Sequence, residues 1–93
     1  MIQSFADSEA ELIWSGRRSR KLPADIQNVA LRKLRLLNQA RVLADLRVPP
    51  GNRLEALIGD RKGQFSIRIN DQYRICFNWE AKGPTDVEIT DYH

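Results

Sequence analysis

Two stretches near the end of the sequence alternate between apolar and polar residues, and this alternation restricts the fold more than any other feature. Residues 64–70 read QFSIRIN and residues 73–79 read YRICFNW. Period-two alternation indicates strands with one buried face. Asn70 and Asp71 between them are typical turn residues, so the two strands should form an antiparallel hairpin. The sequence therefore predicts an antiparallel sheet that buries its apolar side.

The first half of the sequence has the spacing of helices instead. A short helix is expected after Asp7 or Ser8, which suit its N-cap, and Gly16 should end it. Pro23 suits the first turn of a longer helix, which should end between Asn38 and Ala40. Apolar residues recur in this helix at 3.6-residue spacing, which predicts a core-facing stripe. That stripe comprises Ile26, Val29, Ala30, Leu34 and Leu37.

Helices followed by antiparallel strands define an α+β fold class. Further short strands are expected at residues 2–5, 55–58 and 87–92, and the 93 residues should form a single domain, 1–93. The helices should pack on one face of the sheet, because an antiparallel sheet tolerates a wet opposite face. The side chains expected on that solvent face are Ser66, Arg68, Arg74, Cys76 and Asn78.

Basic residues are concentrated in the body of the chain. Fourteen of the fifteen lysines and arginines lie between Arg17 and Arg74, together with five of the acids. This excess fits a polyanionic partner such as nucleic acid or an acidic protein, and it equally fits solvated arginines on helix faces. No apolar run reaches the roughly 20 residues that span a bilayer. The opening residues lack a secretory signal pattern, so a cytoplasmic protein without membrane contact is expected.

A group of basic residues on the predicted sheet could bind phosphate. Arg68 and Arg74 should lie on neighbouring strands and could clamp a phosphate, with Arg61 and Lys62 extending the site. The alternative is that arginine keeps a polar sheet face soluble. With one cysteine and one histidine, the sequence suggests neither an internal disulfide nor a metal site.

The sequence ends in Asp91, Tyr92 and His93. A carboxylate beside an imidazole can orient it and raise its pKa, and the three side chains together supply acid–base groups for phosphoryl transfer. A frayed polar tail is the alternative. Glu55, in an otherwise apolar short strand, could act as a general base or could simply face solvent.

The run GDRKGQFSIRINDQYRICFNW, followed by VEITDYH, resembles HigB toxins of bacterial type II toxin–antitoxin systems. The segment PPGNRLEALIG is most similar to the GraT-like branch of that family. The resemblance covers essentially the whole chain. It implies the RelE/ParE-like fold, in which N-terminal helices pack on one face of a curved antiparallel β-sheet.

The resemblance also implies an activity and its partners. HigB-type toxins enter the ribosomal A site and cleave mRNA there, by attack of an RNA 2′-OH on the adjacent phosphorus. They act without a metal or another cofactor. The expected partner is a HigA-like helix-turn-helix antitoxin, and operator DNA would be contacted only through that antitoxin.

Several residues acquire roles through this resemblance. Arg74 matches the catalytic arginine of the family, and Asp91, Tyr92 and His93 match its proton-transfer terminus. Arg74 would neutralise charge that develops on the pentacoordinate phosphorus. The residues expected to hold flanking phosphates or ribosomal RNA are Arg61, Lys62 and Arg68.

This sequence departs from its relatives at Glu55 and Ile58, where they often carry histidine and lysine. The Glu55 carboxylate could replace the histidine as a base, or its charge could repel phosphate and slow cleavage. A weaker enzyme than the histidine-bearing relatives is expected. Two alternatives remain at this point: a ParE-like inhibitor of DNA gyrase, and a catalytically weak toxin that serves mainly as an antitoxin-bound co-repressor.

Overall fold

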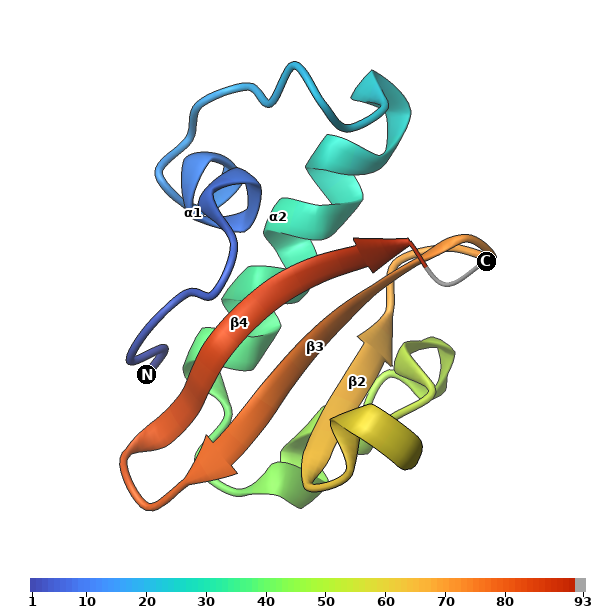
Figure 1. Ribbon diagram of the computed structural model, residues 1–93. Helices are drawn as coiled ribbons and strands as arrows, with labels where there is room; N and C mark the ends of the chain where they lie inside the picture. The colour runs from blue at the N-terminus through green and yellow to red at the C-terminus, as the bar shows by residue number, and fades with distance from the viewer. Residues whose placement is uncertain (92–93) are drawn as a thin grey trace.

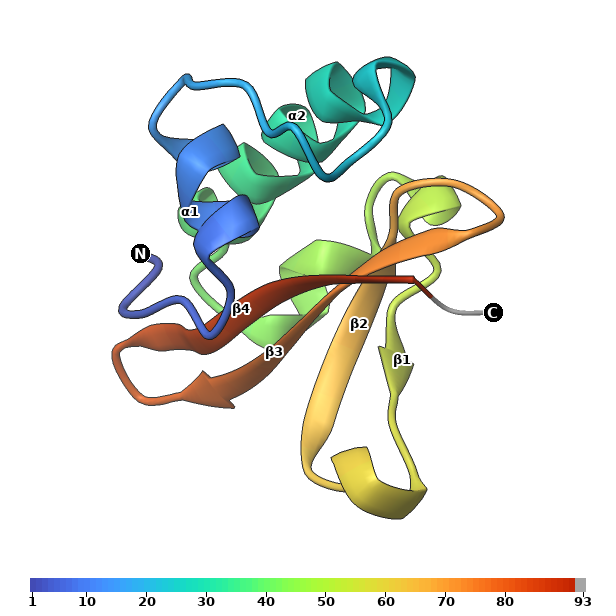
Figure 2. The ribbon, with the colours of Figure 1, turned by 45° about the horizontal axis from the view of Figure 1, so that its top comes forward.

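The computed structural model of the protein describes residues 1–91; Tyr92 and His93 lie outside the described residues. Two α-helices pack on one side of a four-stranded antiparallel sheet with the strand order β1-β2-β3-β4 (Figures 1 and 2). The predicted α+β class is thereby confirmed. The elements are α1 (Ser8–Trp14), α2 (Ala24–Gln39), β1 (Glu55–Ala56), β2 (Gln64–Arg68), β3 (Tyr73–Glu80) and β4 (Gly83–Asp91).

Between α2 and β2 the chain forms three short 3₁₀-helices and the short edge strand β1. Pro49 and Pro50 lie within this irregular part, and proline there disfavours a longer helix. The three 3₁₀-helices are η1 (Leu43–Arg47), η2 (Pro50–Asn52) and η3 (Gly59–Arg61).

No helix within the described part of the chain is long and apolar enough to cross a membrane.

The first helix begins and ends where the sequence predicts. Asp7 is its N-cap, and one carboxylate oxygen accepts a hydrogen bond of 3.0 Å from the backbone N–H of Glu9. The other oxygen accepts from the N–H of Ile89 at 3.2 Å, which ties the helix to β4. Gly16 follows the helix with φ +86°, a conformation that glycine adopts without steric cost.

The second helix supplies most of the helical side of the core. Its predicted end near residues 38–40 is confirmed, since it ends at Gln39. Four residues of the predicted stripe are buried and Val29 is partly buried. Burial of one large aliphatic side chain contributes about 1.5–3 kcal/mol, so this stripe is a main source of the fold's stability. The four buried residues are Ile26, Ala30, Leu34 and Leu37.

The hairpin predicted from the alternating stretches is present, with Phe65 paired to Phe77 and Ile67 to Ile75. Ile75 pairs in turn with Ile89 of β4, so the apolar side chains of three strands lie on the face that α2 covers. A register shift between Cys76 and Asn78 interrupts the β3–β4 pairing. Such bulges increase local twist, in accord with the curved strands in Figure 1.

The prediction of a strand at residues 2–5 is wrong. Only Phe5 forms a bridge, in parallel with Val87. Asp86, just before Val87, has φ +50°, and its N–H bonds to the Ser4 hydroxyl rather than to a backbone carbonyl. This local turn of the backbone prevents a continuous ladder, and residues 2–6 instead make isolated hydrogen bonds to the edge of β4.

Candidate functional site

The sheet face opposite the helices carries most of the polar residues singled out in the sequence. Residues paired directly across antiparallel strands point to the same face. The register therefore places two central rows of side chains beside one another on this face. The predicted membership of Ser66, Arg68, Arg74, Cys76 and Asn78 is confirmed. The first row is Glu55, Ser66, Cys76 and Glu88, and the second is Arg68, Arg74 and Thr90.

The expectation that this face is open to solvent is wrong for its central residues. Ser66 and Cys76 are 0% exposed and Arg74 is 7% exposed. The reason lies in the neighbouring irregular segment, where the backbone of Arg53 and the side chain of Arg61 both bond to groups on this face. The centre of the face is thus a polar interior, and its groups need hydrogen-bond partners.

Arg74 is the best-anchored charged group of this interior. Its Nε donates a hydrogen bond of 2.8 Å to the hydroxyl of Ser66, and its Nη2 donates one of 2.7 Å to the carbonyl of Arg53. Arg53 has a left-handed backbone, with φ 45° and ψ 57°. Nη1 of Arg74 lies 3.3 Å from Oε1 of Glu55, and the two side chains form an ion pair. Fixed donors of this kind can stabilise charge without reorganisation during a reaction.

Arg61 and Arg68 each face a carboxylate as well. Nη1 of Arg61, at the end of η3, lies 2.5 Å from Oε1 of Glu88 and 3.0 Å from Oε1 of Gln64. Arg68 forms a salt bridge with Asp71 in the β2–β3 turn. A phosphate approaching either arginine would therefore have to exchange with a carboxylate.

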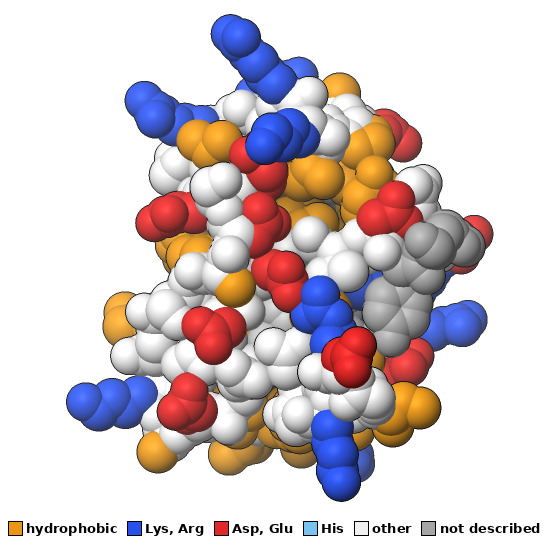
Figure 3. Space-filling view, in the orientation of Figure 1, with side chains coloured by type: hydrophobic (Ala, Val, Ile, Leu, Met, Phe, Trp, Pro, Cys, Tyr) orange, Lys and Arg blue, Asp and Glu red, His pale blue; other side chains and the backbone are white. Residues whose placement is uncertain are grey.

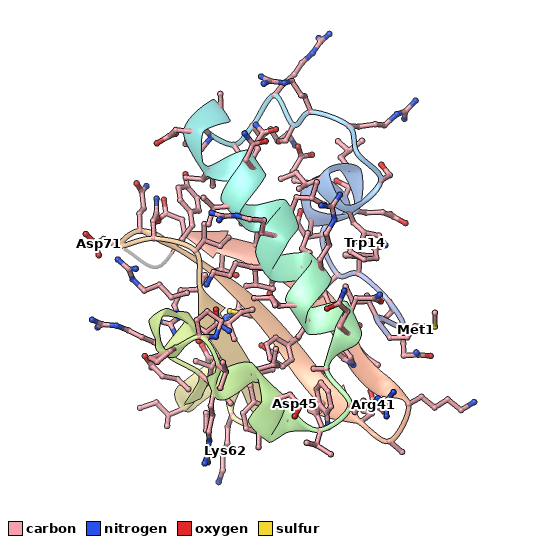
Figure 4. The ribbon with its side chains drawn as sticks, turned by 180° about the vertical axis from the view of Figure 1, so that it is seen from behind. Met1, Trp14, Arg41, Asp45, Lys62 and Asp71 are labelled. Carbon is pink, nitrogen blue, oxygen red and sulfur yellow. The ribbon has the colours of Figure 1, made fainter. Side chains whose placement is uncertain are left out.

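Lys62 is exposed, and its side chain points away from the fold in Figure 4. Other basic side chains project at the top of Figure 3, over the connection between α1 and α2, whereas acidic and basic groups are interspersed below. On the face shown in Figure 3, the basic side chains are therefore not gathered into one patch.

Asp91 ends β4 and is paired with Tyr73. Arg74 pairs with Thr90, so Asp91 belongs by register to the opposite side of the sheet from Arg74. Its Oδ2 accepts a hydrogen bond of 3.0 Å from the side chain of Gln72. Tyr92 and His93, the other two members of the predicted proton-transfer group, are outside the described residues.

Sequence reasoning missed two partners of Arg74. The Ser66 hydroxyl could have been found, because Ser66 lies on the polar face of the strand next to Arg74. The Arg53 carbonyl carries no sequence signal, since a backbone acceptor becomes available through the turn of the loop. Burial also raises the pKa of the Cys76 thiol beside them.

Groups of three or more histidine, cysteine, aspartate or glutamate side chains that could hold a metal ion do not occur among residues 1–91. The sheet face described above carries guanidinium groups, carboxylates and hydroxyls. Guanidinium groups held in this way can bind and orient an anion.

The sequence matches the profile of a protein family, the RelE-like toxin of the type II toxin–antitoxin system HigB, over residues 3–93. It is 45% identical to Toxin HigB-1 of Vibrio cholerae serotype O1 over 80 residues, which cover 85% of this chain and 84% of the relative. It is also 38% identical over 60 residues to an uncharacterized protein of Haemophilus influenzae, covering 64% and 59% of the two chains. The chain therefore belongs to the HigB-like family of RelE-like toxins of type II toxin–antitoxin systems.

Proposed function

We propose that this toxin is a metal-independent endoribonuclease that cleaves mRNA on the ribosome and thereby inhibits translation. One observation carries the proposal: Ser66 and Arg53 hold the guanidinium of Arg74 in place by hydrogen bonds of 2.8 and 2.7 Å. Arg74 is in register with Thr90, two residues before Tyr92 in the sequence. A pre-oriented cation in this position suits a reaction in which negative charge develops on phosphorus.

In the proposed reaction the 2′-oxygen of the RNA attacks the adjacent phosphorus while a base takes its proton. The new 2′-O–P bond forms as the bond to the 5′-oxygen breaks, and an acid returns a proton to that oxygen. The products are a 2′,3′-cyclic phosphate and a 5′-hydroxyl end. Asp91, Tyr92 and His93 are proposed to supply proton transfer and positioning, because imidazole exchanges protons near neutral pH.

The remaining basic residues are proposed to bind the RNA or ribosome. Arg61 and Arg68 would exchange their carboxylate partners for flanking phosphates, and exposed Lys62 would add a further contact. The toxin is small, so the ribosomal A site would align the mRNA. Alignment can supply about 7–11 kcal/mol of a barrier, so the free toxin should cleave naked RNA poorly.

A type II system supplies an antitoxin for its toxin, and we propose a HigA-like helix-turn-helix protein as the partner. Operator DNA would be bound through the antitoxin, and the reaction would take place in the cytoplasm. Placement within the GraT-like branch of the family remains a prediction, as does a slower reaction caused by Glu55.

The function is tested by inducing the toxin in cells, with and without its antitoxin, and mapping mRNA 5′ ends on translating ribosomes. The proposal predicts new 5′ ends within coding regions that depend on translation and disappear with antitoxin. A parallel assay of DNA supercoiling by purified gyrase tests the ParE-like alternative. Inhibited supercoiling without new mRNA 5′ ends would show that the toxin acts on gyrase. No effect in either assay would indicate a toxin that serves mainly as a co-repressor.

A further inference from the structure

We propose that Glu55 is a displaceable counter-ion of Arg74, which the RNA phosphate replaces, and that it limits the affinity of the toxin for RNA. The inference deepens the proposed function and depends on it. It assigns Glu55 a binding role instead of the role of a general base. The ion pair between Nη1 of Arg74 and Oε1 of Glu55, at 3.3 Å, is the starting observation.

Ser66, Arg53 and Glu55 do not hold Arg74 equally. Ser66 and Arg53 are neutral acceptors at 2.8 and 2.7 Å, and both of these bonds are shorter than the contact with Glu55. The side chain of Arg74 is 9% exposed, whereas that of Glu55 is 52% exposed. The neutral partners therefore fix the guanidinium, and the charged partner lies at its solvent side.

The backbone around Glu55 is also the least supported part of the sheet. β1 consists of Glu55 and Ala56 alone, lies at the sheet edge and is paired only with β2 within the described residues. A half-exposed side chain there can turn into water without leaving a cavity. Arg74 cannot follow it, because Ser66 and Arg53 hold Nε and Nη2.

Displacement would thus present the Nη1 side of a fixed guanidinium to an incoming phosphate. The carboxylate and the phosphate are both anions, so close contact of both with one guanidinium at the same edge is opposed by their repulsion. A phosphate that accepts a charge-assisted hydrogen bond from Nη1 makes a shorter and stronger contact than the 3.3 Å carboxylate has. Glu55 and the RNA phosphate then compete for Arg74, and this competition weakens RNA binding.

Removing the negative charge of Glu55 should strengthen phosphate binding if Glu55 is a counter-ion, and it should slow cleavage if Glu55 is a base. We expect Glu55→Gln to bind inorganic phosphate about two- to tenfold more tightly than the wild type, as loss of an ion-pair competitor allows. The probe is the Arg74 Nε–H resonance in NMR, followed during titration with inorganic phosphate. Glu11→Gln is the matched control, because Glu11 is an exposed residue of α1 and its change alters net charge equally.

Single-turnover cleavage on programmed ribosomes supplies the second readout. Glu55→Gln should lower the toxin concentration for half-maximal rate two- to tenfold and leave the maximal rate within about twofold, as expected for a binding effect. A fall in maximal rate of about 100-fold or more would show that Glu55 is a base and overturn the inference. Unchanged phosphate affinity in Glu55→Gln would overturn it as well. If the wild type cleaves no mRNA on ribosomes, the proposed function fails, and the phosphate titration still decides whether Glu55 competes at Arg74.

Discussion

Ser66 and Arg74, diagonal neighbours on β2 and β3, are joined by a hydrogen bond of 2.8 Å between the serine hydroxyl and the guanidinium Nε. Ser66 is 0% exposed and Arg74 is 7% exposed, so the bond lies in the protein interior. A buried guanidinium needs such partners, and those partners also fix its direction. Stability and the placement of the proposed catalytic charge are therefore coupled at this pair.

Ser66→Ala tests that coupling. We expect a loss of about 1.5–3 kcal/mol in the free energy of unfolding, because the buried charged donor Nε loses its acceptor. Cleavage on ribosomes should fall about tenfold, since displaced groups commonly cost one to two orders of magnitude. Ser8→Ala, at an exposed residue of α1, is the control and should change neither quantity. Full activity in a destabilised Ser66→Ala protein would show that the bond is structural only.

The elements themselves could largely be predicted from the sequence. The Asp7 cap, the Pro23 boundary and the turn at Asn70 and Asp71 are local signals, and each depends on a few adjacent residues. The alternation of residues 64–70 likewise determined which side chains share a face. These features need no knowledge of distant parts of the chain.

The burial of the polar face could not be predicted in the same way. Alternation tells which face Ser66, Arg74 and Cys76 occupy, but it does not tell what covers that face. The cover includes residues 53–61, a stretch without regular periodicity, and the Arg53 carbonyl reaches Arg74 through a left-handed turn. Glu55 was a candidate in isolation, and only the register opposite Ser66 places its carboxylate beside Arg74.

Asn52 is predicted to hold this irregular segment in place. Its side chain is fully buried, donates to the carbonyls of Leu46 at 3.1 Å and Val48 at 3.3 Å, and accepts from the ammonium of Lys33. Asn52→Ala should lower the free energy of unfolding by about 2–4 kcal/mol, because these buried groups lose their partners. Urea denaturation measures the change.

Asn28→Ala is the control for that experiment, since Asn28 is an exposed residue of α2 and alanine favours the helix. It should leave the midpoint unchanged or raise it slightly. Equal stability of the two variants would mean that the 3₁₀ turns hold their shape without the Asn52 side chain.

Cys76 predicts a pH dependence of stability. Burial raises the pKa of its thiol above the ordinary value of 9.0, so the folded protein keeps the proton at pH values where the unfolded chain has lost it. Well below pH 9 the thiol is protonated in both the folded and the unfolded protein, so it does not change the free energy of unfolding there. As the pH rises through and above that value, the free energy of unfolding falls.

Urea denaturation of the wild type and of Cys76→Ala at several pH values between about 7 and 10 isolates this effect from other titrating groups. The wild type should lose more stability than the variant over the upper part of that range. Parallel pH curves for the two proteins would contradict the raised pKa of the buried thiol.

The decisive measurement is the single-turnover cleavage of a 5′-labelled mRNA by purified toxin, with the mRNA either free or bound to programmed ribosomes. Wild type should cut rapidly only on ribosomes and leave a 2′,3′-cyclic phosphate. Arg74→Lys retains the charge but loses the fork that Ser66 and Arg53 orient. Its rate should fall about 100- to 1000-fold, and that of His93→Gln about 100- to 10,000-fold. Rapid cleavage of free RNA, or wild-type rates in both variants, would contradict a ribosome-dependent reaction centred on Arg74 and His93.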